Sequence, residues 1–428
     1  YQTVWHKVHR QLRQLTREEI DMKKRHLRAL SFIMSAILLA GCTTTPTVGT
    51  GTQEAAQASE TGTPEAAEDG SAGGETKETE AVASQQEFPP LKVAKDRPLK
   101  VGYLYSNLEA ESCTRSYNQI RIEAPHRGWE LTEVYFNAQK PEEARTGMQT
   151  LITQDVDAVV IYNMEIVGIA DLILQARQNG IGVYNVDNQL VPGVVANSCQ
   201  PNGVAAAEFA YYMGEKYLWN ANYAIITAPS LQVHVERTDP IKAIYDQYPG
   251  MKLLGEESLN PSGSESMGQQ SYNFTKRFIE KYGNELDILV TSYDGAAVTA
   301  DEAAAQAIGG TDVAIIGVDG GSETWSHMRK GGNFKYSYAQ PTELYCHKIC
   351  NLVEELQVQG LKPGDEGCSI TAFGETIYSN GKIIDQDHVP APNQSIHSVF
   401  DFYGGDPEDP EAWYNWNDGP GIYMIADK

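Results

Sequence analysis

Short apolar runs alternate with amphipathic segments from residue 99 onward. Four runs are predicted to be buried β-strands because they are short and rich in Val, Ile and Tyr: 99–105, 131–136, 157–162 and 182–187. One helix is predicted to begin at Pro141, with two glutamates in its first turn, and another, over about 165–178, to end at Asn179-Gly180. Such alternation predicts a parallel sheet covered by helices on both faces.

The same alternation begins again after Asn202. It predicts strands at 222–228, 252–257, 287–292, 313–319 and 335–340, and helices near 203–217, 238–247, 268–282, 296–308 and 342–358. The fold class is therefore α/β, with two Rossmann-like lobes that each contain a parallel sheet. Ligands of open parallel sheets bind beyond the carboxyl ends of the strands, so we expect a ligand cleft between the lobes.

The amino-terminal part of the chain has a different pattern. From Met22, a basic cluster precedes about a dozen mostly apolar residues that end at Ala40. This order is typical of an export signal, and the apolar run is too short to cross a bilayer as a stable helix. The sequence Leu39-Ala40-Gly41-Cys42 also resembles the bacterial lipoprotein box. That resemblance implies a signal peptide over 22–41 and a lipid on Cys42.

Residues 42–98 are mostly small or polar, with almost no large apolar side chain before Phe88. Such a segment cannot bury enough apolar surface to offset its ordering entropy, so we expect a disordered linker that serves as a tether. Residues 1–21 precede the export signal, and we interpret them as a non-native or untranslated leader. Sequencing the mature amino terminus tests this interpretation.

The charge balance is strongly acidic. The chain has 33 Lys and Arg against 57 Asp and Glu, for a net charge of −24. Residues 1–42 hold eight of the basic and three of the acidic residues, which leaves 25 − 54 = −29 for the remainder. This charge repels phosphate backbones and anionic membranes, so we expect no nucleic-acid partner.

Polar residues follow several predicted strands at their carboxyl ends. In the first lobe these are Ser106, Asn107, Asn163, Asp187 and Asn188; in the second they are Asp294, Asp319 and Gln340, with Arg237 near the start of a helix. Any one of them is as well explained by helix capping. Their recurrence on successive strand ends favours a binding site for a small polar ligand.

No catalytic or metal-binding pattern accompanies these residues. The sequence has no GxSxG elbow, no HExxH helix and no Gly-rich turn after the first strand. Cys346 and Cys350, with His347 between them, are interpreted as two half-buried thiols around a histidine and not as a metal site. We expect no enzyme activity, no cofactor and no metal. The acidic, aromatic extension 401–428 does not match a calcium loop, and we expect Trp413 and Trp416 to pack it on the surface.

Five segments carry a family resemblance: QDVDAVVIYN, ARQNGIGVYNVDN, VERTDPIKAI, AIIGVDGGSETWSHMRKGG and YAQPTELYC. Together they resemble the ribose/galactose-type family of periplasmic-binding-protein fold I, the solute receptors of ABC sugar importers, over about residues 99–360. The resemblance implies two lobes joined by a three-crossover hinge that close over one sugar. It implies a first lobe of 99–201 and 341–372 and a second lobe of 202–340 and 373–400.

The resemblance also assigns roles to individual residues. Asp187 and Asp319 match family carboxylates that accept hydrogen bonds from sugar hydroxyls, and Gln340 matches the polar hinge residue. Arg237 matches the arginine of a family turn, although Pro240-Ile241 replaces its Gly-Phe.

The chain departs from the family at three places. The loop SNLEAESCTRSY replaces an Asn and two aromatics, Asn188 replaces an arginine, and Tyr293 replaces an asparagine. The pocket therefore suits either a different sugar or a ligand that is not a sugar. Tyr293 either supplies the missing aromatic plane or lies at the rim.

Two disulfide bridges are predicted for an oxidising compartment. Cys113 and Cys199 are expected on one edge of the first lobe and predicted to be bridged, and Cys368 is predicted to pair with Cys346 or Cys350.

These features together predict an extracytoplasmic, lipid-anchored monomer that captures a small polar ligand, expected to be a sugar, and passes it to an ABC permease. The alternative is a sensory receptor with the same cleft that signals to a membrane kinase. An α/β hydrolase is disfavoured because the catalytic residues are missing. A DNA-binding regulator is disfavoured by the lipid signal and the missing amino-terminal helix-turn-helix.

Overall fold

The computed structural model describes residues 87–106, 110–137, 140–162, 166–392, 394, 397 and 401–416. The leader 1–21, the signal segment 22–41, Cys42 and nearly all of the predicted linker lie outside the described residues, as do Asn107, Asn163 and 417–428. No helix within the described ranges combines the length and apolar character that a membrane crossing needs.

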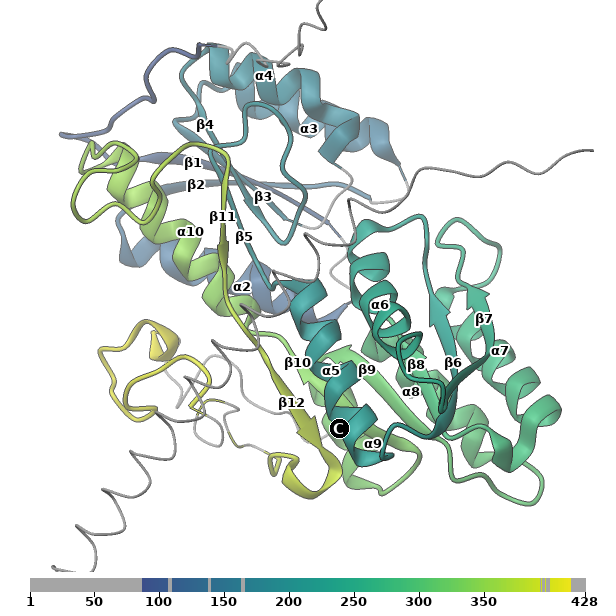
Figure 1. Cartoon of the computed structure of the whole chain (residues 1–428). Coiled ribbons are helices and arrows are strands. Elements are labelled where there is room, and N and C mark those ends of the chain that lie inside the picture. Colours follow the sequence, from purple (N-terminus) through teal and green to yellow (C-terminus); the bar gives the residue numbers. More distant parts are fainter. Residues whose placement is uncertain are drawn as a thin grey trace, which may run out of the picture. The chain divides into compact units, whose positions relative to one another are not determined.

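The first lobe contains a six-stranded, all-parallel sheet with the order β11-β5-β4-β3-β1-β2 (Figure 1). Its strands are β1 (Lys100–Tyr105), β2 (Glu130–Tyr135), β3 (Ala158–Tyr162), β4 (Gly182–Val186), β5 (Ala196–Cys199) and β11 (Glu375–Tyr378). Helices α2 (Glu111–His126) and α10 (Thr342–Gln357) pack on one face, and α3 (Pro141–Thr153) and α4 (Ala170–Gln178) on the other. Tyr103 and Leu104 of β1 therefore enter opposite cores.

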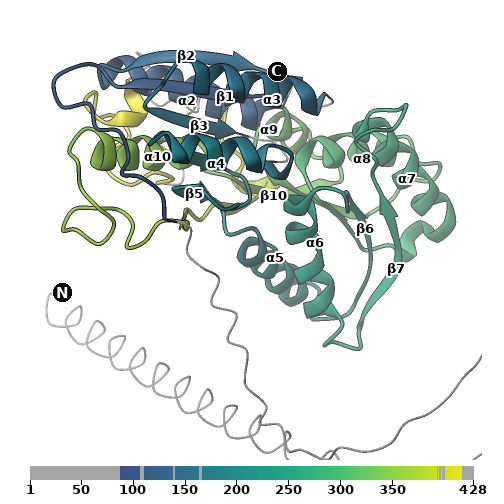
Figure 2. The same ribbon diagram turned by 90° about the horizontal axis from the view of Figure 1, so that it is seen from above.

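The second lobe repeats this plan with the order β12-β10-β9-β8-β6-β7, in which only β12 is antiparallel to its neighbour (Figure 1). Figure 2 shows this lobe from above, with its sheet between two groups of helices. Its strands are β6 (Ala221–Thr227), β7 (Met251–Ser258), β8 (Ile288–Thr291), β9 (Ala314–Asp319), β10 (Phe334–Ala339) and β12 (Lys382–Asp385). Helices α5 (Asn202–Lys216) and α6 (Gln232–Tyr245) pack on one face, and α7 (Met267–Tyr282), α8 (Asp294–Ala305) and α9 (Ser322–Arg329) on the other.

The predicted α/β fold with two parallel-rich sheets is confirmed, but some elements differ from the sequence-based expectation. Strand β5 has the sequence ANSC, and neither its length nor its pattern signals a strand. Helix α6 begins at Gln232 instead of 238, which places Arg237 inside the helix and not at its start. In both lobes the strand order reverses beside the first strand of the unit, the point where doubly wound sheets bind ligands.

The chain passes between the lobes three times. The first two crossovers lie at 200–201, between β5 and α5, and at 340–341, between β10 and α10. The sequence predicts the third after residue 372, but this is wrong. β11 pairs with β5 from Glu375 to Tyr378, so the crossover lies at 379–381, before β12 joins the second sheet.

The carboxy-terminal segment 401–416 contacts both lobes. Phe402 packs in the second-lobe core. In the first lobe, the ring of Trp413 stacks on His347 of α10, with centroids 4.2 Å apart, and Trp416 stacks on His126 of α2 at 4.6 Å. The two tryptophans therefore attach this segment to the first lobe.

None of the five cysteines among the described residues forms a disulfide, so neither predicted bridge is present. Cys113 lies within α2 and not in a loop, and it packs in the first-lobe core with Cys346 and Cys350. Cys199 ends β5, where its sulfur accepts a hydrogen bond from Asn197. Burial raises the pKa of Cys113 and of Cys199 to about 12, which keeps both thiols protonated and disfavours oxidation.

We expect thiol titration of the denatured, unreduced protein to find all five of these cysteines reactive. Because no bridge restrains the chain, a reductant is expected to leave the melting temperature unchanged. A titration that detects only three or one of the five thiols before reduction would show that a bridge forms.

Candidate ligand-binding site

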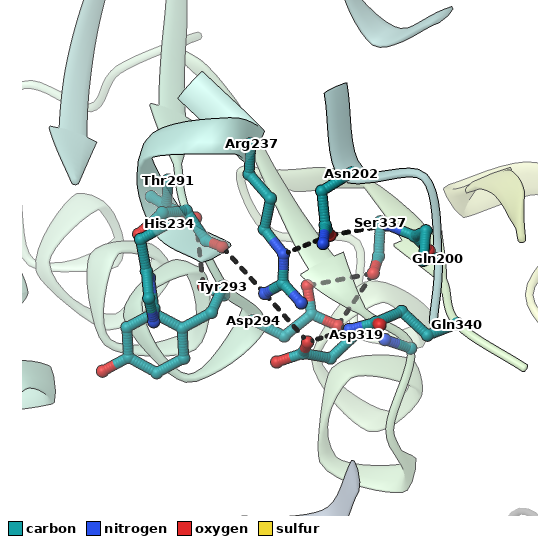
Figure 3. Close-up of polar contacts among 12 residues, drawn as sticks. Gln200, Asn202, His234, Arg237, Thr291, Tyr293, Asp294, Asp319, Ser337 and Gln340 are labelled. Atoms are coloured by element: carbon teal, nitrogen blue, oxygen red, sulfur yellow. Dashed lines mark hydrogen bonds and ion pairs between the residues drawn. The ribbon is translucent and has the colours of Figure 1, made fainter. Parts of the chain in front are cut away.

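Arg237 is the centre of a polar network at the carboxyl ends of the second-lobe strands (Figure 3). It lies on α6 and is only 6% exposed. Its Nη1 donates to Asp319 Oδ1 at 3.3 Å and to the Ser292 carbonyl at 3.2 Å, and its Nε donates to Asn202 Oδ1 at 3.0 Å. The guanidinium therefore joins the ends of β8 and β9 to the first crossover.

Asp319 ends β9 and is held by two donors. In addition to Arg237, Gln340 Nε2 donates to its Oδ1 at 2.6 Å, and the Gln340 backbone N–H donates to the Asp319 carbonyl at 3.0 Å. Burial raises the pKa of Asp319, and the neighbouring Arg237 acts in the opposite direction. One carboxylate oxygen thus has protein donors, and the side chain is still 21% exposed.

Asp187 follows β4 in the first lobe and adopts a left-handed backbone with φ of 52°, which Asp tolerates better than most residues. Its backbone N–H donates to Ser198 O at 2.9 Å. Its carboxylate accepts no hydrogen bond from any described residue. Burial raises the pKa of Asp187, Arg237 lowers it and Asp319 raises it, so the groups from the two lobes share one electrostatic environment.

The remaining predicted residues have more local roles. Ser106 directly follows β1 and is fully buried. The Asn188 side chain donates to Ile161 O at 3.1 Å, so its amide is tied to the first-lobe sheet. Tyr293 precedes α8, and its ring meets His234 edge-on with centroids 5.4 Å apart. Burial, with a contribution from Asp319, raises the pKa of Tyr293.

Asp294 is placed differently from its expected position. Its carboxylate is buried inside the second lobe and does not join Asp187 and Asp319. Oδ2 accepts from Gly320 N at 2.7 Å and Thr324 Oγ1 at 2.8 Å, and Ser337 Oγ donates to both oxygens at 2.8 and 2.9 Å. Asp294 therefore holds the turn that follows Asp319.

Asp294 also predicts a pH effect on stability. Burial, followed by the Asp319 carboxylate, raises the pKa of Asp294 to about 7, above its ordinary value of 3.8. Between these values the folded chain keeps a proton that the unfolded chain releases. The contribution of Asp294 to the free energy of unfolding is therefore present at low pH and lost as the pH rises toward 7, by up to about 1.4 kcal/mol per pH unit.

Urea unfolding of the wild type and of Asp294→Asn between about pH 4.5 and pH 7.5 tests this effect. The difference in unfolding free energy between the two proteins is expected to fall as the pH rises. A difference that stays constant across the window would contradict the assignment.

Sequence reasoning missed several members of the network. His234 Nδ1 is 2.8 Å from Ser292 Oγ, and burial lowers the pKa of His234 to about 3, so the imidazole is neutral at physiological pH. Gln200 Nε2 donates to Asn202 Oδ1 at 3.2 Å. The polar Gln-Pro-Asn of the crossover was the one sequence signal for Gln200 and Asn202.

Among the residues that the structure describes, no group of three His, Cys, Asp or Glu side chains is arranged to hold a metal ion. A surface depression of about 590 Å³ lies elsewhere, lined by α3 and by Leu172 of α4. Arg145 at this depression is paired with Asp171, with Nη2 and Oδ2 2.7 Å apart. The depression therefore does not share residues with the Arg237 network.

Two doubly wound lobes, three crossovers and coupled polar groups from both lobes define a two-lobed solute-binding fold. Residues 102–353, more than half of the chain, match a family model described as a periplasmic binding protein domain. The chain belongs to this family. The family is one of binding proteins.

Two curated relatives are similar over part of their length. A xylitol-binding protein of Mycolicibacterium smegmatis is 26% identical over 186 residues, which are 43% of this chain and 52% of the relative. A D-apiose import binding protein of Actinobacillus succinogenes is 24% identical over 201 residues, which are 45% of this chain and 61% of the relative. The chain thus spans between half and two thirds of these relatives.

Solved structures share the fold at lower identity. An ABC sugar transporter subunit from Rhodobacter sphaeroides is 20% identical, with a TM-score of 0.57 over 68% of this chain and 98% of that chain. A solute-binding protein from Agrobacterium vitis with bound allitol is 18% identical, with a TM-score of 0.59 over 68% of this chain and 97% of that one. A Bacillus halodurans protein with bound myo-inositol is 15% identical, with a TM-score of 0.57 over 69% and 98%.

Proposed function

We propose that this protein is the solute-binding component of an ABC importer and that it binds a small sugar or polyol between its lobes. The observation that carries the proposal is the pair of carboxylates, Asp187 and Asp319, which come from different lobes and share the field of Arg237. Asp187 has no donor within the described residues. A ligand that brings its own O–H donors satisfies both groups.

The charges of the site favour a neutral, polyhydroxylated ligand. Two carboxylates and one guanidinium leave an excess negative charge, which repels anionic ligands. The neutral imidazole of His234 and the amide of Gln340 add polar groups without adding charge. The relatives support this class, because they are named for xylitol and D-apiose and the similar structures contain allitol and myo-inositol.

Hydrogen bonds from both lobes to one ligand favour the closed arrangement, because an open protein offers the ligand only half of its partners. The closed form then presents both lobes together to a membrane permease. The resemblance of residues 39–42 to a lipoprotein box supports a lipid on Cys42 that holds the protein at the membrane.

The ligand class is tested by a thermal-shift screen of pentitols, hexitols, inositols and aldoses, with amino acids and nucleosides as the other classes. A ligand at 100 times its Kd stabilises the folded state by about 2.7 kcal/mol, so a true ligand raises the melting temperature clearly. Stabilisation by an amino acid or nucleoside, with none by any polyhydroxylated compound, would reject the proposed class.

The anchor is tested separately by Cys42→Ser. We expect the wild type in the membrane fraction of cells, released only by detergent, and the variant in the soluble extracytoplasmic fraction. A variant that stays in the membrane fraction would contradict lipidation at Cys42.

A further inference from the structure

The amino-terminal turn of α2 contacts the second lobe. Glu111, the first residue of α2 in the first lobe, accepts two hydrogen bonds at its Oε1 from Ser322, the first residue of α9. The Ser322 backbone N–H donates at 2.8 Å and its Oγ at 2.9 Å. A first-lobe carboxylate thus lies at the positive end of a second-lobe helix, where negative charge is favoured.

Arg115, one helical turn further along α2, makes a second set of contacts. Its guanidinium forms two parallel bonds with Glu343 of α10, at 2.7 and 2.8 Å. It also donates to the carbonyl of Gly320 in the second lobe at 3.3 Å and to the carbonyl of Gln340 in the second crossover at 2.9 Å. Arg115 is 8% exposed and Glu343 is fully buried, so water competes little for these bonds.

Both sets of contacts include hydrogen bonds to the segment that follows Asp319. Gly320 is bonded to Arg115, and Ser322 to Glu111. The approach is close: a Cβ atom on Gly321 would lie 3.2 Å from the carboxyl carbon of Glu111, so glycine at this position leaves room for the carboxylate. The position of Asp319 is therefore tied to the first lobe by contacts that lie outside Asp187, Arg237 and Asp319 themselves.

We propose that Glu111 and Arg115 form an interlobe clasp that favours the closed arrangement without ligand and positions Asp319 for binding. Glu111 and Arg115 both lie in the segment 106–117, where the sequence departs from its family, and the clasp gives this segment a role. The part of the inference that concerns affinity rests on the proposed function; the part that concerns closure does not.

The clasp predicts a specific pattern of affinities. A ligand that binds only the closed form has an apparent Kd equal to its intrinsic Kd divided by the closed fraction. The contacts of Glu111 raise the closed fraction, so their loss raises the apparent Kd of every such ligand by the same factor. We expect about a tenfold loss for Glu111→Gln, the size of one charge-assisted hydrogen bond, with the ratio between two ligands unchanged.

Closure itself is measured on the full chain, without ligand, by double electron–electron resonance between two spin labels. Spin labels are attached at Gln149→Cys on α3 and Lys276→Cys on α7, both exposed, in a protein with Cys42 and Cys368 replaced by serine. The other four cysteines are buried. Glu111→Gln and Ser322→Ala each remove part of the clasp, and Ser322→Ala is the milder variant if the first fails to fold.

Glu323→Gln is the matched control, because Glu323 is exposed and adjacent to Ser322 in the first turn of α9. We expect Glu111→Gln and Ser322→Ala to shift the ligand-free distances away from the wild-type distribution toward an open population, and Glu323→Gln to leave it unchanged. Superimposable distributions for the wild type and both clasp variants would overturn the inference. If the distances shift but the protein binds no sugar or polyol, the clasp is supported and the proposed function is rejected.

Discussion

Asp187→Asn is expected to weaken ligand binding by about 100-fold while leaving the ligand-free protein as stable as the wild type or more stable. The carboxylate accepts no bond from the described residues, and its raised pKa means that the ionised form is disfavoured in the folded state. Replacing this carboxylate with an uncharged amide therefore removes an unfavourable buried charge from the ligand-free protein. With ligand bound, the same change removes charge-assisted bonds of about 1.5–3 kcal/mol each.

Isothermal titration with the ligand found by screening, together with urea unfolding of the free protein, measures both effects. Asp96→Asn is the control, since Asp96 is an exposed aspartate of the segment that precedes β1. Asparagine suits the left-handed backbone at position 187, so a loss of binding would not reflect a misfolded turn. Unchanged affinity in Asp187→Asn would place the ligand elsewhere.

Arg237→Met, unlike Asp187→Asn, is expected to lower both the free energy of unfolding and the affinity for the ligand by a large amount. The guanidinium is buried and joins Asp319, Ser292 and Asn202. Removing one partner of a buried ion pair leaves an uncompensated charge and typically costs about 3–5 kcal/mol. Because Arg237 also lowers the pKa of Asp187, its loss favours protonation of both site carboxylates.

Arg277→Met provides the comparison on the same lobe. Arg277 pairs with Glu257 at 2.9 Å, but the two side chains are 53% and 33% exposed, and such surface pairs contribute at most about 1 kcal/mol. Chemical unfolding of the two variants side by side separates the buried contact from the exposed one. Equal, small decreases in the free energy of unfolding of both variants would show that the Arg237 network does not stabilise the second lobe.

Much of the candidate site was predictable because parallel strands bring their carboxyl ends to one edge. That geometry placed Asp187, Asp319 and Gln340 at this edge from strand positions alone. It failed for Asp294, because the direction of that side chain depends on Ser337 and Thr324, donors that lie 43 and 30 residues further along the chain. Strand-end position predicts where a residue lies but not which donors surround it.

Other parts of the fold carry no local signal. β11 is only four residues long and pairs with β5, about 180 residues earlier in the chain, so its lobe could not be assigned from pattern. The contact between Glu111 and Ser322 spans 211 residues, and the segment 106–117 that contains Glu111 was recognisable only as a departure from the family. The predicted disulfides failed for the same reason, since the position of Cys113 within a buried helix was not evident from its neighbours.

The most direct test of the central claim is a crystal structure of the protein with the sugar or polyol that stabilises it most. We predict one ligand whose hydroxyl groups lie within hydrogen-bonding distance of both Asp187 in the first lobe and Asp319 in the second. A ligand bound to one lobe only, or outside both of these residues, would contradict capture between the lobes.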